Sequence, residues 1–232
     1  MKGSKLEWMK LLSEVDVLEP LSAEQMDLVA QRTFDRSFLE DESIYLPGDA
    51  TEVIYLLLAG RVRLYGMVRD RELTFDVIRA GDMFGEASLT ERTQIEYAQA
   101  LEPSMVGLLE LNTFWRLFGE NPEFATRIIK LVGERSRTTR SRMTDIALKH
   151  VSARLASLIL DLVQAEGVVT REGYYHVSAH YSHDQLAAMI GVKRLAVTRA
   201  FGDLQDSGCV QLRRRQIYVI DLAALKSWAR RD

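Results

Sequence analysis

SHDQLAAMIGVKRLAVTRAFGDLQD, residues 182–206, is the most informative stretch of the sequence. It opens with Ser182 and, three residues later, Gln185, a capping-box pattern that predicts the start of a helix. Gly191 ends this helix, because glycine tolerates the left-handed backbone of a helix C-terminus. Ala187 is small enough to let a second helix approach closely. The stretch therefore predicts two short helices joined by a tight turn.

The second helix, expected over residues 193–206, separates into two faces when each residue is rotated by 100°. The apolar face holds Ala196, Val197, Ala200, Phe201 and Leu204, and the opposite face holds Arg194, Leu195, Thr198, Arg199 and Gly202. Arginine matches the edge of a guanine or a phosphate with its planar fork of donors. We therefore predict a DNA-reading helix, in which Arg194 and Arg199 contact bases and Lys193 and Thr198 support them. The alternative is a structural helix pair whose charged face is merely solvated.

A hairpin with a basic tip is expected after this helix. Residues 209–212 and 216–220 read as two short strands, and the residues between them are Arg213, Arg214 and Arg215. Such a wing would contact phosphates beside the reading helix.

Charge is distributed unevenly along the 232 residues. The net charge is -3, but residues 1–120 carry 12 Lys and Arg against 22 Asp and Glu, whereas residues 121–232 carry 18 against 11. An acidic front half and a basic rear half are typical of a sensor joined to a DNA-binding module. No apolar run is long enough for a membrane span, residues 1–10 do not resemble a signal peptide, and there is a single cysteine. We expect a cytoplasmic location without membrane contact.

The front half changes from helical to strand periodicity. Residues 6–33 predict one or two amphipathic helices, and glycine-punctuated β-rich runs follow over residues 43–49, 53–58, 61–68, 73–78, 96–101 and 105–111. Many short strands separated by turns indicate a small antiparallel β-barrel or jelly roll. The expected fold class is α+β, with this β-domain first, a long helix next and a winged helix-turn-helix last.

Residues 122–149 predict one long helix, because the segment has a helical composition and a single internal glycine. Its apolar stripe is narrow, which favours pairing with a second copy of the chain over packing within its own chain. The polar middle of the helix, with Arg135, Thr139 and Arg140, is expected to meet a ligand, its symmetry copy or the β-domain. The predicted domains are thus 1–121 (sensor), 122–149 (dimerisation) and 150–232 (DNA binding).

The order of these parts resembles the Crp/Fnr family of bacterial transcription regulators. The segments that carry the resemblance are LPGD (46–49), GRV (60–62), GDMFGEASL (81–89) and GVKRLAVTRAFGDL (191–204). The resemblance covers nearly the whole chain. It implies a cyclic-nucleotide-binding-like barrel, a homodimer, a palindromic promoter site on double-stranded DNA and RNA polymerase as a partner.

The resemblance also implies an effector pocket. Glu86 matches the family's ribose-binding glutamate, and Thr139 aligns with a position of the long helix that contacts the base. Gln94 and Ile95 stand where the family has the Arg-Ser/Thr pair that binds the cyclic phosphate, and Arg92 is a poor substitute for that arginine. Because a buried phosphate without a cation is costly, this departure argues against cyclic AMP or cyclic GMP. The candidate pocket residues are Glu86, Ala87, Ser88, Gln94, Arg135, Thr139 and Arg140.

Other cofactors are excluded by residue type. All four histidines (His150, His176, His180 and His183) and Cys209 lie after residue 149, so the barrel has no ligand for an iron–sulfur cluster or for His- or Cys-ligated haem. The histidine spacing fits no standard zinc site, so no metal is expected.

The reading helix departs from the commonest family pattern, Arg-Glu-x-x-x-Arg, because Leu195 replaces the glutamate. In this respect it is similar to the nitrogen-control regulator NtcA. The half-site is expected to differ from TGTGA, with Leu195 against a thymine methyl group. The same similarity makes 2-oxoglutarate a candidate effector, and Arg135 matches an arginine of the long helix. A regulator without any effector is the other option.

We predict a homodimeric, sequence-specific regulator with a divergent effector pocket. The alternative is a small-molecule sensor whose winged helix mediates protein contacts. An enzyme is not expected, because the sequence contains no P-loop, no G-x-S-x-G elbow and no Cys/His pair in the barrel.

Overall fold

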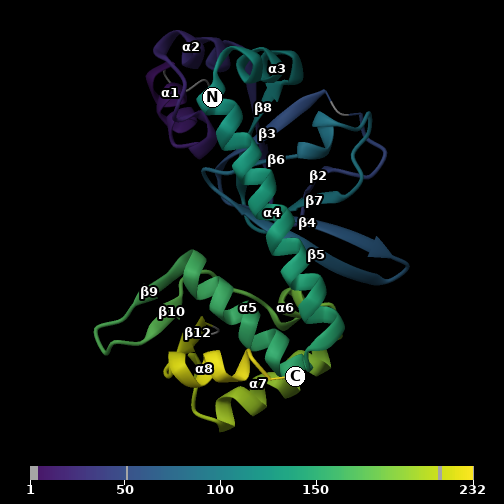
Figure 1. Ribbon diagram of the computed structural model, residues 1–232, viewed down its shortest axis with the longest axis vertical. Coiled ribbons are helices and arrows are strands. Elements are labelled where there is room, and N and C mark those ends of the chain that lie inside the picture. Colours follow the sequence, from purple (N-terminus) through teal and green to yellow (C-terminus); the bar gives the residue numbers. More distant parts are fainter. Residues whose placement is uncertain (1–4, 51, 214–215, 232) are drawn as a thin grey trace. The chain divides into compact units, whose positions relative to one another are not determined.

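The computed structural model describes residues 5–50, 52–213 and 216–231, except for the side chains of Lys5 and Ser88. The chain forms two compact units, residues 1–66 with 75–137 and residues 67–74 with 138–232. The predicted α+β class is confirmed, with antiparallel sheets first, a long helix and a C-terminal helix-turn-helix (Figure 1).

The helices of the N-terminal unit are α1 (Lys5–Ser13), η1 (Asp16–Leu18), α2 (Ala23–Gln31), η2 (Glu86–Leu89) and α3 (Leu111–Glu120), together with the first part of α4 (Pro122–Leu148). Its strands are β1 (Thr33–Phe38), β2 (Ser43–Tyr45), β3 (Val53–Ala59), β4 (Arg61–Val68), β5 (Arg71–Arg79), β6 (Met83–Phe84), β7 (Tyr97–Ala100) and β8 (Ser104–Glu110).

These strands form two sheets of four, in the orders β1-β8-β3-β6 and β2-β7-β4-β5. Strands in both sheets pair antiparallel, with Thr33 opposite Leu109 in the first and Val62 opposite Ala100 in the second. The arrangement is like a jelly roll and is not a closed barrel. One apolar core lies between the sheets and includes Tyr45, Tyr55, Leu57, Leu64, Ile78, Phe84 and Val106.

A second core joins the helices of this unit to the outer face of a sheet. It contains Leu12, Leu18, Val29, Leu56, Leu109, Phe114, Leu117, Phe124 and Ile128. The start of α4 therefore packs within its own chain through Phe124 and Ile128. Farther along the same helix, Ile129 is 65% exposed and Val132 is 40% exposed.

Strand β1, helix α3 and helix α8 are among the elements that the sequence did not predict, as are the short β6 and η2. Strand β1 buries only its two end residues, so it lacks the alternation that identifies a strand, and its pairing with β8 holds it in the sheet. Helix α3 follows β8 directly, without a side-chain cap that marks its start. Helix α8 (Leu222–Trp228) is a short helix capped by the side chain of Asp221.

The C-terminal unit contains the end of α4, then α5 (Val151–Glu166), α6 (His183–Ile190), α7 (Arg194–Asp206) and α8. Its sheet has the order β11-β12-β10-β9, with β9 (Gly167–Val169), β10 (Tyr175–Val177), β11 (Val210–Arg213) and β12 (Gln216–Val219). Strands β11 and β12 are the predicted wing, although Arg214 and Arg215 at its tip lie outside the described residues. No helix in the described part of the chain has the length and apolar character needed to cross a bilayer.

Candidate nucleic-acid interface and effector pocket

The two helices of the helix-turn-helix begin and end where local chemistry dictates. The hydroxyl of Ser182 accepts from the Gln185 amide, and the Gln185 side chain accepts from the Ser182 amide, which completes the predicted capping box. Gly191 has φ +69°, the left-handed conformation that ends α6 and starts the turn into α7.

Helix α7 is sorted into the two predicted faces. Val197, Ala200, Phe201 and Leu204 are buried, and Ala196 is half-buried. The opposite side exposes Arg194, Leu195, Thr198 and Arg199, which we call the reading face. Leu195 is 62% exposed, so most of its apolar side chain is not covered by the rest of the chain. Gly202, also predicted on this side, is half-buried.

Contacts with α5 and α6 fix the orientation of α7. The hydroxyl of Ser152 on α5 donates to Asp203 at 2.6 Å, and Ser152 is buried. The His183 ring on α6 stacks on the Phe201 ring, with centroids 5.3 Å apart and planes 6° apart. On the surface, Arg194 lies 3.6 Å from Asp184, but both side chains are about two-thirds exposed, so this ion pair contributes little stability.

Two cationic residues flank the reading face, one at the start of α7 and one on the wing. Lys193 is exposed at the N-terminal boundary of α7. Arg213 donates twice to Gln211 on its own strand and lies 3.7 Å from Glu172.

Between the wing and the two helices is an open groove of about 360 Å³, lined by His180, Tyr181, Ser182, His183, Asp184, Leu186, Arg194, Phe201, Leu212 and Ile217.

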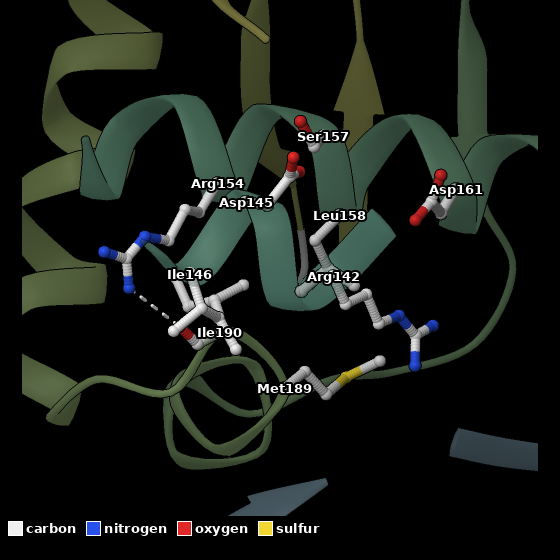
Figure 2. A pocket seen from close by; sticks show the side chains of 9 residues that line it. All are labelled: Arg142, Asp145, Ile146, Arg154, Ser157, Leu158, Asp161, Met189 and Ile190. Atoms are coloured by element: carbon white, nitrogen blue, oxygen red, sulfur yellow. Dashed lines mark hydrogen bonds between the residues drawn. The ribbon is translucent and has the colours of Figure 1, made fainter. Parts of the chain in front are cut away.

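A smaller cavity, of about 30 Å³, lies where the end of α4 meets α5 and the end of α6 (Figure 2). At its edge, Arg154 donates to the Lys149 carbonyl at 2.9 Å and reaches the Ile190 carbonyl at 3.5 Å, the contact drawn as a dashed line. Lys149 in turn pairs with Asp145 at 2.8 Å and donates to Ser157 at 3.0 Å. These bonds fix the last residue of α6 to α5, one position before the Gly191 turn.

In the N-terminal unit, two of the predicted pocket residues meet directly. Arg135 on α4 donates to the Glu86 carboxylate at 2.8 Å and to the Met83 carbonyl at 2.6 Å. The same guanidinium lies 3.6 Å from Asp76 on β5. Its side chain is 16% exposed, so the guanidinium that the sequence suggested for a ligand already has partners within the chain.

Acidic groups surround this guanidinium. Burial and the nearby Glu86 carboxylate raise the pKa of Glu96 to about 7, an effect that Arg135 partly offsets. Burial also raises the pKa of Asp82, against the lowering effects of an Arg79 backbone hydrogen bond and of Arg135. Asp76, Asp82 and Glu96 were not among the predicted pocket residues, because only the fold brings Arg135 close to all three of them.

The other predicted pocket residues are dispersed. Gln94 is buried, and its backbone pairs with Gly48 and Asp49. Ala87 is half-buried, and the side chain of Ser88 lies outside the description. Thr139 and Arg140 are exposed on the part of α4 that belongs to the C-terminal unit. Within the residues that the structure describes, no three His, Cys, Asp or Glu side chains gather in a way that could hold a metal ion.

Comparison with known proteins identifies both units. Residues 35–121 match the family model for a cyclic nucleotide-binding domain, and residues 153–228 match the model for a Crp-like helix-turn-helix domain. The global nitrogen regulator of Synechococcus elongatus is 28% identical over 192 residues, which cover 81% of this chain and 86% of that protein.

Solved structures show the same architecture. A Crp-family transcriptional regulator of Thermus thermophilus aligns with a TM-score of 0.69 at 26% identity, covering 84% of this chain and 96% of that one. A CooA mutant from Carboxydothermus hydrogenoformans aligns with a TM-score of 0.78 at 20% identity, covering 93% and 94%, which is a likeness of fold. The two domain models, the regulator among the relatives and the shared fold agree with one another. The chain therefore belongs to the Crp/Fnr family of transcription regulators, with a DNA-binding helix-turn-helix and a cyclic nucleotide-binding domain.

Proposed function

We propose that the chain is a homodimeric regulator that reads a palindromic promoter site with one α7 helix from each subunit. The observation that carries this proposal is the reading face, where two arginines, a threonine and an exposed leucine stand opposite a buried apolar face. Arg194 and Arg199 would read base edges, and Leu195 would contact a thymine methyl group. Two such helices would enter successive major grooves about 34 Å apart.

The exposed side of α4 supports the dimer. Its exposed residues Ile129, Val132, Ser136, Thr139 and Met143 follow the alternating three- and four-residue spacing of a coiled-coil seam. Ile129 and Met143 are each 65% exposed, so both remain largely open to a second helix. The small Ser136 and Thr139 in the middle of the seam would let two helices approach closely.

Arg199→Ala tests the reading face. DNA selected from a random pool by the wild-type protein serves as the ligand, and affinity is measured against it and against unrelated DNA. We expect the variant to lose about 1–3 kcal/mol of affinity for the selected site and to discriminate less well. Arg116→Ala, which removes an exposed arginine of α3, is the matched control. Wild-type affinity of Arg199→Ala for the selected site would refute the assignment.

Wing arginines act differently in this proposal. Neutralising Arg214 should weaken binding to all sequences alike and reduce the salt dependence by about one counterion. The rival function, a sensor whose winged helix contacts another protein, predicts no salt-sensitive DNA affinity at all.

Replacing both Ile129 and Val132 by glutamate tests the dimer. Sedimentation should show a monomer with an unchanged circular dichroism spectrum, and binding to the palindrome should be lost while weak half-site binding remains. Ile95→Glu is the control, because Ile95 is 69% exposed elsewhere on the N-terminal unit. A doubly substituted protein that stays dimeric would contradict the proposed seam.

For the effector, we propose that this pocket does not bind a cyclic nucleotide. Gln94 occupies the position of the family's phosphate-binding arginine, and Arg135 is already engaged by Glu86 and Asp76. A phosphate entering beside Glu86, Glu96, Asp76 and Asp82 would meet acidic side chains, while Arg135 already pairs with two of them. Titration calorimetry with cyclic AMP and cyclic GMP should give no binding heat, and DNA selection should succeed without either. The same charge disfavours 2-oxoglutarate. RNA polymerase remains the partner expected from the family.

A further inference from the structure

The hydroxyl of Thr198, in the middle of the reading face, has two polar neighbours within the protein. Its Oγ1 lies 3.0 Å from Nδ1 of His183 and 3.2 Å from the carbonyl oxygen of Arg194. The first contact joins α6 to α7, and the second closes one turn within α7. We propose that His183 is a positioning residue that fixes Thr198 as a hydrogen-bond acceptor and thereby selects a base that carries an amino group. This inference rests on the proposed function of the reading face.

His183 is itself held firmly enough to fix the hydroxyl. It is the first residue of α6, directly after Ser182, whose reciprocal bonds with Gln185 set the start of that helix. Its ring lies flat against the ring of Phe201, which is 1% exposed and belongs to the core beneath α7. The imidazole therefore has one well-defined direction, with Nδ1 toward Thr198.

Counting hydrogens shows what Thr198 can offer to DNA. A threonine hydroxyl has one hydrogen and two lone pairs. If the hydrogen points to the Arg194 carbonyl, which can only accept, then Nδ1 of His183 carries a proton and donates to Oγ1. If Nδ1 is unprotonated, the hydroxyl donates to His183 instead. In both tautomers the hydrogen is used within the protein, and Thr198 presents a lone pair outward.

An outward acceptor discriminates among the bases of the major groove. Adenine and cytosine present amino groups there, whereas thymine and guanine present carbonyl oxygens that would face the Thr198 lone pair unfavourably. One hydrogen bond is worth about 0.5–1.5 kcal/mol, so the amino-bearing bases should be preferred about 2- to 13-fold at the contacted position. Without His183, the Arg194 carbonyl alone still holds the hydroxyl hydrogen, so the hydroxyl can turn that hydrogen outward by giving up this one bond and can then donate to thymine or guanine as well.

Three substitutions separate these roles. Thr198→Val removes the hydroxyl and keeps the shape, His183→Phe keeps a flat ring over Phe201 but removes the hydrogen bond, and His183→Gln restores a polar group that can donate or accept. Each purified full-length variant is titrated with a panel of selected-site duplexes in which every half-site position carries each of the four bases.

Wild-type protein and His183→Gln should show one position at which adenine or cytosine is favoured about 2- to 13-fold over thymine and guanine. Thr198→Val and His183→Phe should both lose that preference while keeping those at other positions. The double variant should lose no more than either single variant, because the two residues act through one hydrogen bond.

A wild-type base preference in His183→Phe, or in Thr198→Val, would overturn the proposal. Thr198 is exposed, so the valine variant still tests the proposal if His183→Phe destabilises the fold. Arg199→Ala is measured on the same panel. If Arg199→Ala also reads every position as the wild type does, the reading face itself is wrong. If only His183→Phe behaves as the wild type, the reading face stands and the role of His183 fails.

Discussion

Replacing Glu96 by glutamine should stabilise the protein at alkaline pH and leave its stability unchanged in acid. Burial, together with the Glu86 carboxylate, raises the pKa of Glu96 from 4.5 to about 7. The folded protein therefore keeps a proton on Glu96 that the unfolded chain has already released above pH 4.5. The stability that this proton contributes is complete below pH 4.5 and is lost as the pH rises through 7.

The size of the effect follows from the interval between the two pKa values. From 4.5 to about 7, at 1.36 kcal/mol per pH unit, the loss is about 3 kcal/mol. Glu96 is only half-buried, so solvent reduces this cost and we expect about 2 kcal/mol. Glutamine is neutral at every pH and resembles the protonated acid in shape, so Glu96→Gln should not suffer this loss.

Urea unfolding between pH 4.5 and 8.5 at constant ionic strength measures the difference. The free energies of unfolding of the wild type and of Glu96→Gln should agree near pH 4.5, diverge as the pH rises to about 7, and then differ by about 2 kcal/mol in favour of the variant up to pH 8.5. Glu40→Gln, at an exposed turn, is the control and should follow the wild type. A difference that is constant with pH, or a wild type that is more stable at pH 8.5, would refute the acidic cluster described around Glu86.

Three further substitutions test contacts that stabilise each unit by itself. Arg135→Met leaves the half-buried Glu86 and its acidic neighbours unpaired, so it should lower the free energy of unfolding by about 2–4 kcal/mol at pH 8 and by less at pH 5, where carboxylates gain protons. Equal losses at both pH values in urea unfolding would contradict this prediction. Gly85 has φ +79°, and the Cβ of Gly85→Ala would lie 2.6 Å from the Tyr55 ring, so the free energy of unfolding should fall by about 2 kcal/mol. An unchanged denaturation midpoint would contradict this prediction. Ser182→Ala removes the α6 cap and should cost about 1 kcal/mol, with weaker specific DNA binding; wild-type thermal stability would argue against the cap.

Signals that act over three or four residues could be interpreted from the sequence alone. The capping box of Ser182 and Gln185, the left-handed Gly191 and the two faces of α7 all appear in the structure as predicted, because each depends on helix geometry and on near neighbours. The extent of the long helix was predicted for the same reason. The residue types of the reading face followed directly from this local pattern.

Contacts between residues far apart in the sequence needed the tertiary structure. Strand β1 has no recognisable alternation and is a strand because β8 pairs with it. Arg135 matched a family position, but only the fold showed that Glu86 and Met83, 49 and 52 residues away, already hold its guanidinium. The role of His183 was missed for a similar reason, since its partners Thr198 and Phe201 lie on the next helix.

The sequence by itself thus determined the helix-turn-helix, its outward residues and the order of the parts, since local backbone preferences and periodicity specify them. The tertiary structure decided which charges neutralise one another. It also decided which side of α4 stays uncovered, with Phe124 buried in its own core and Ile129 exposed. Long-range packing sets the burial and the charged neighbours of each side chain, and neither can be read from residue spacing.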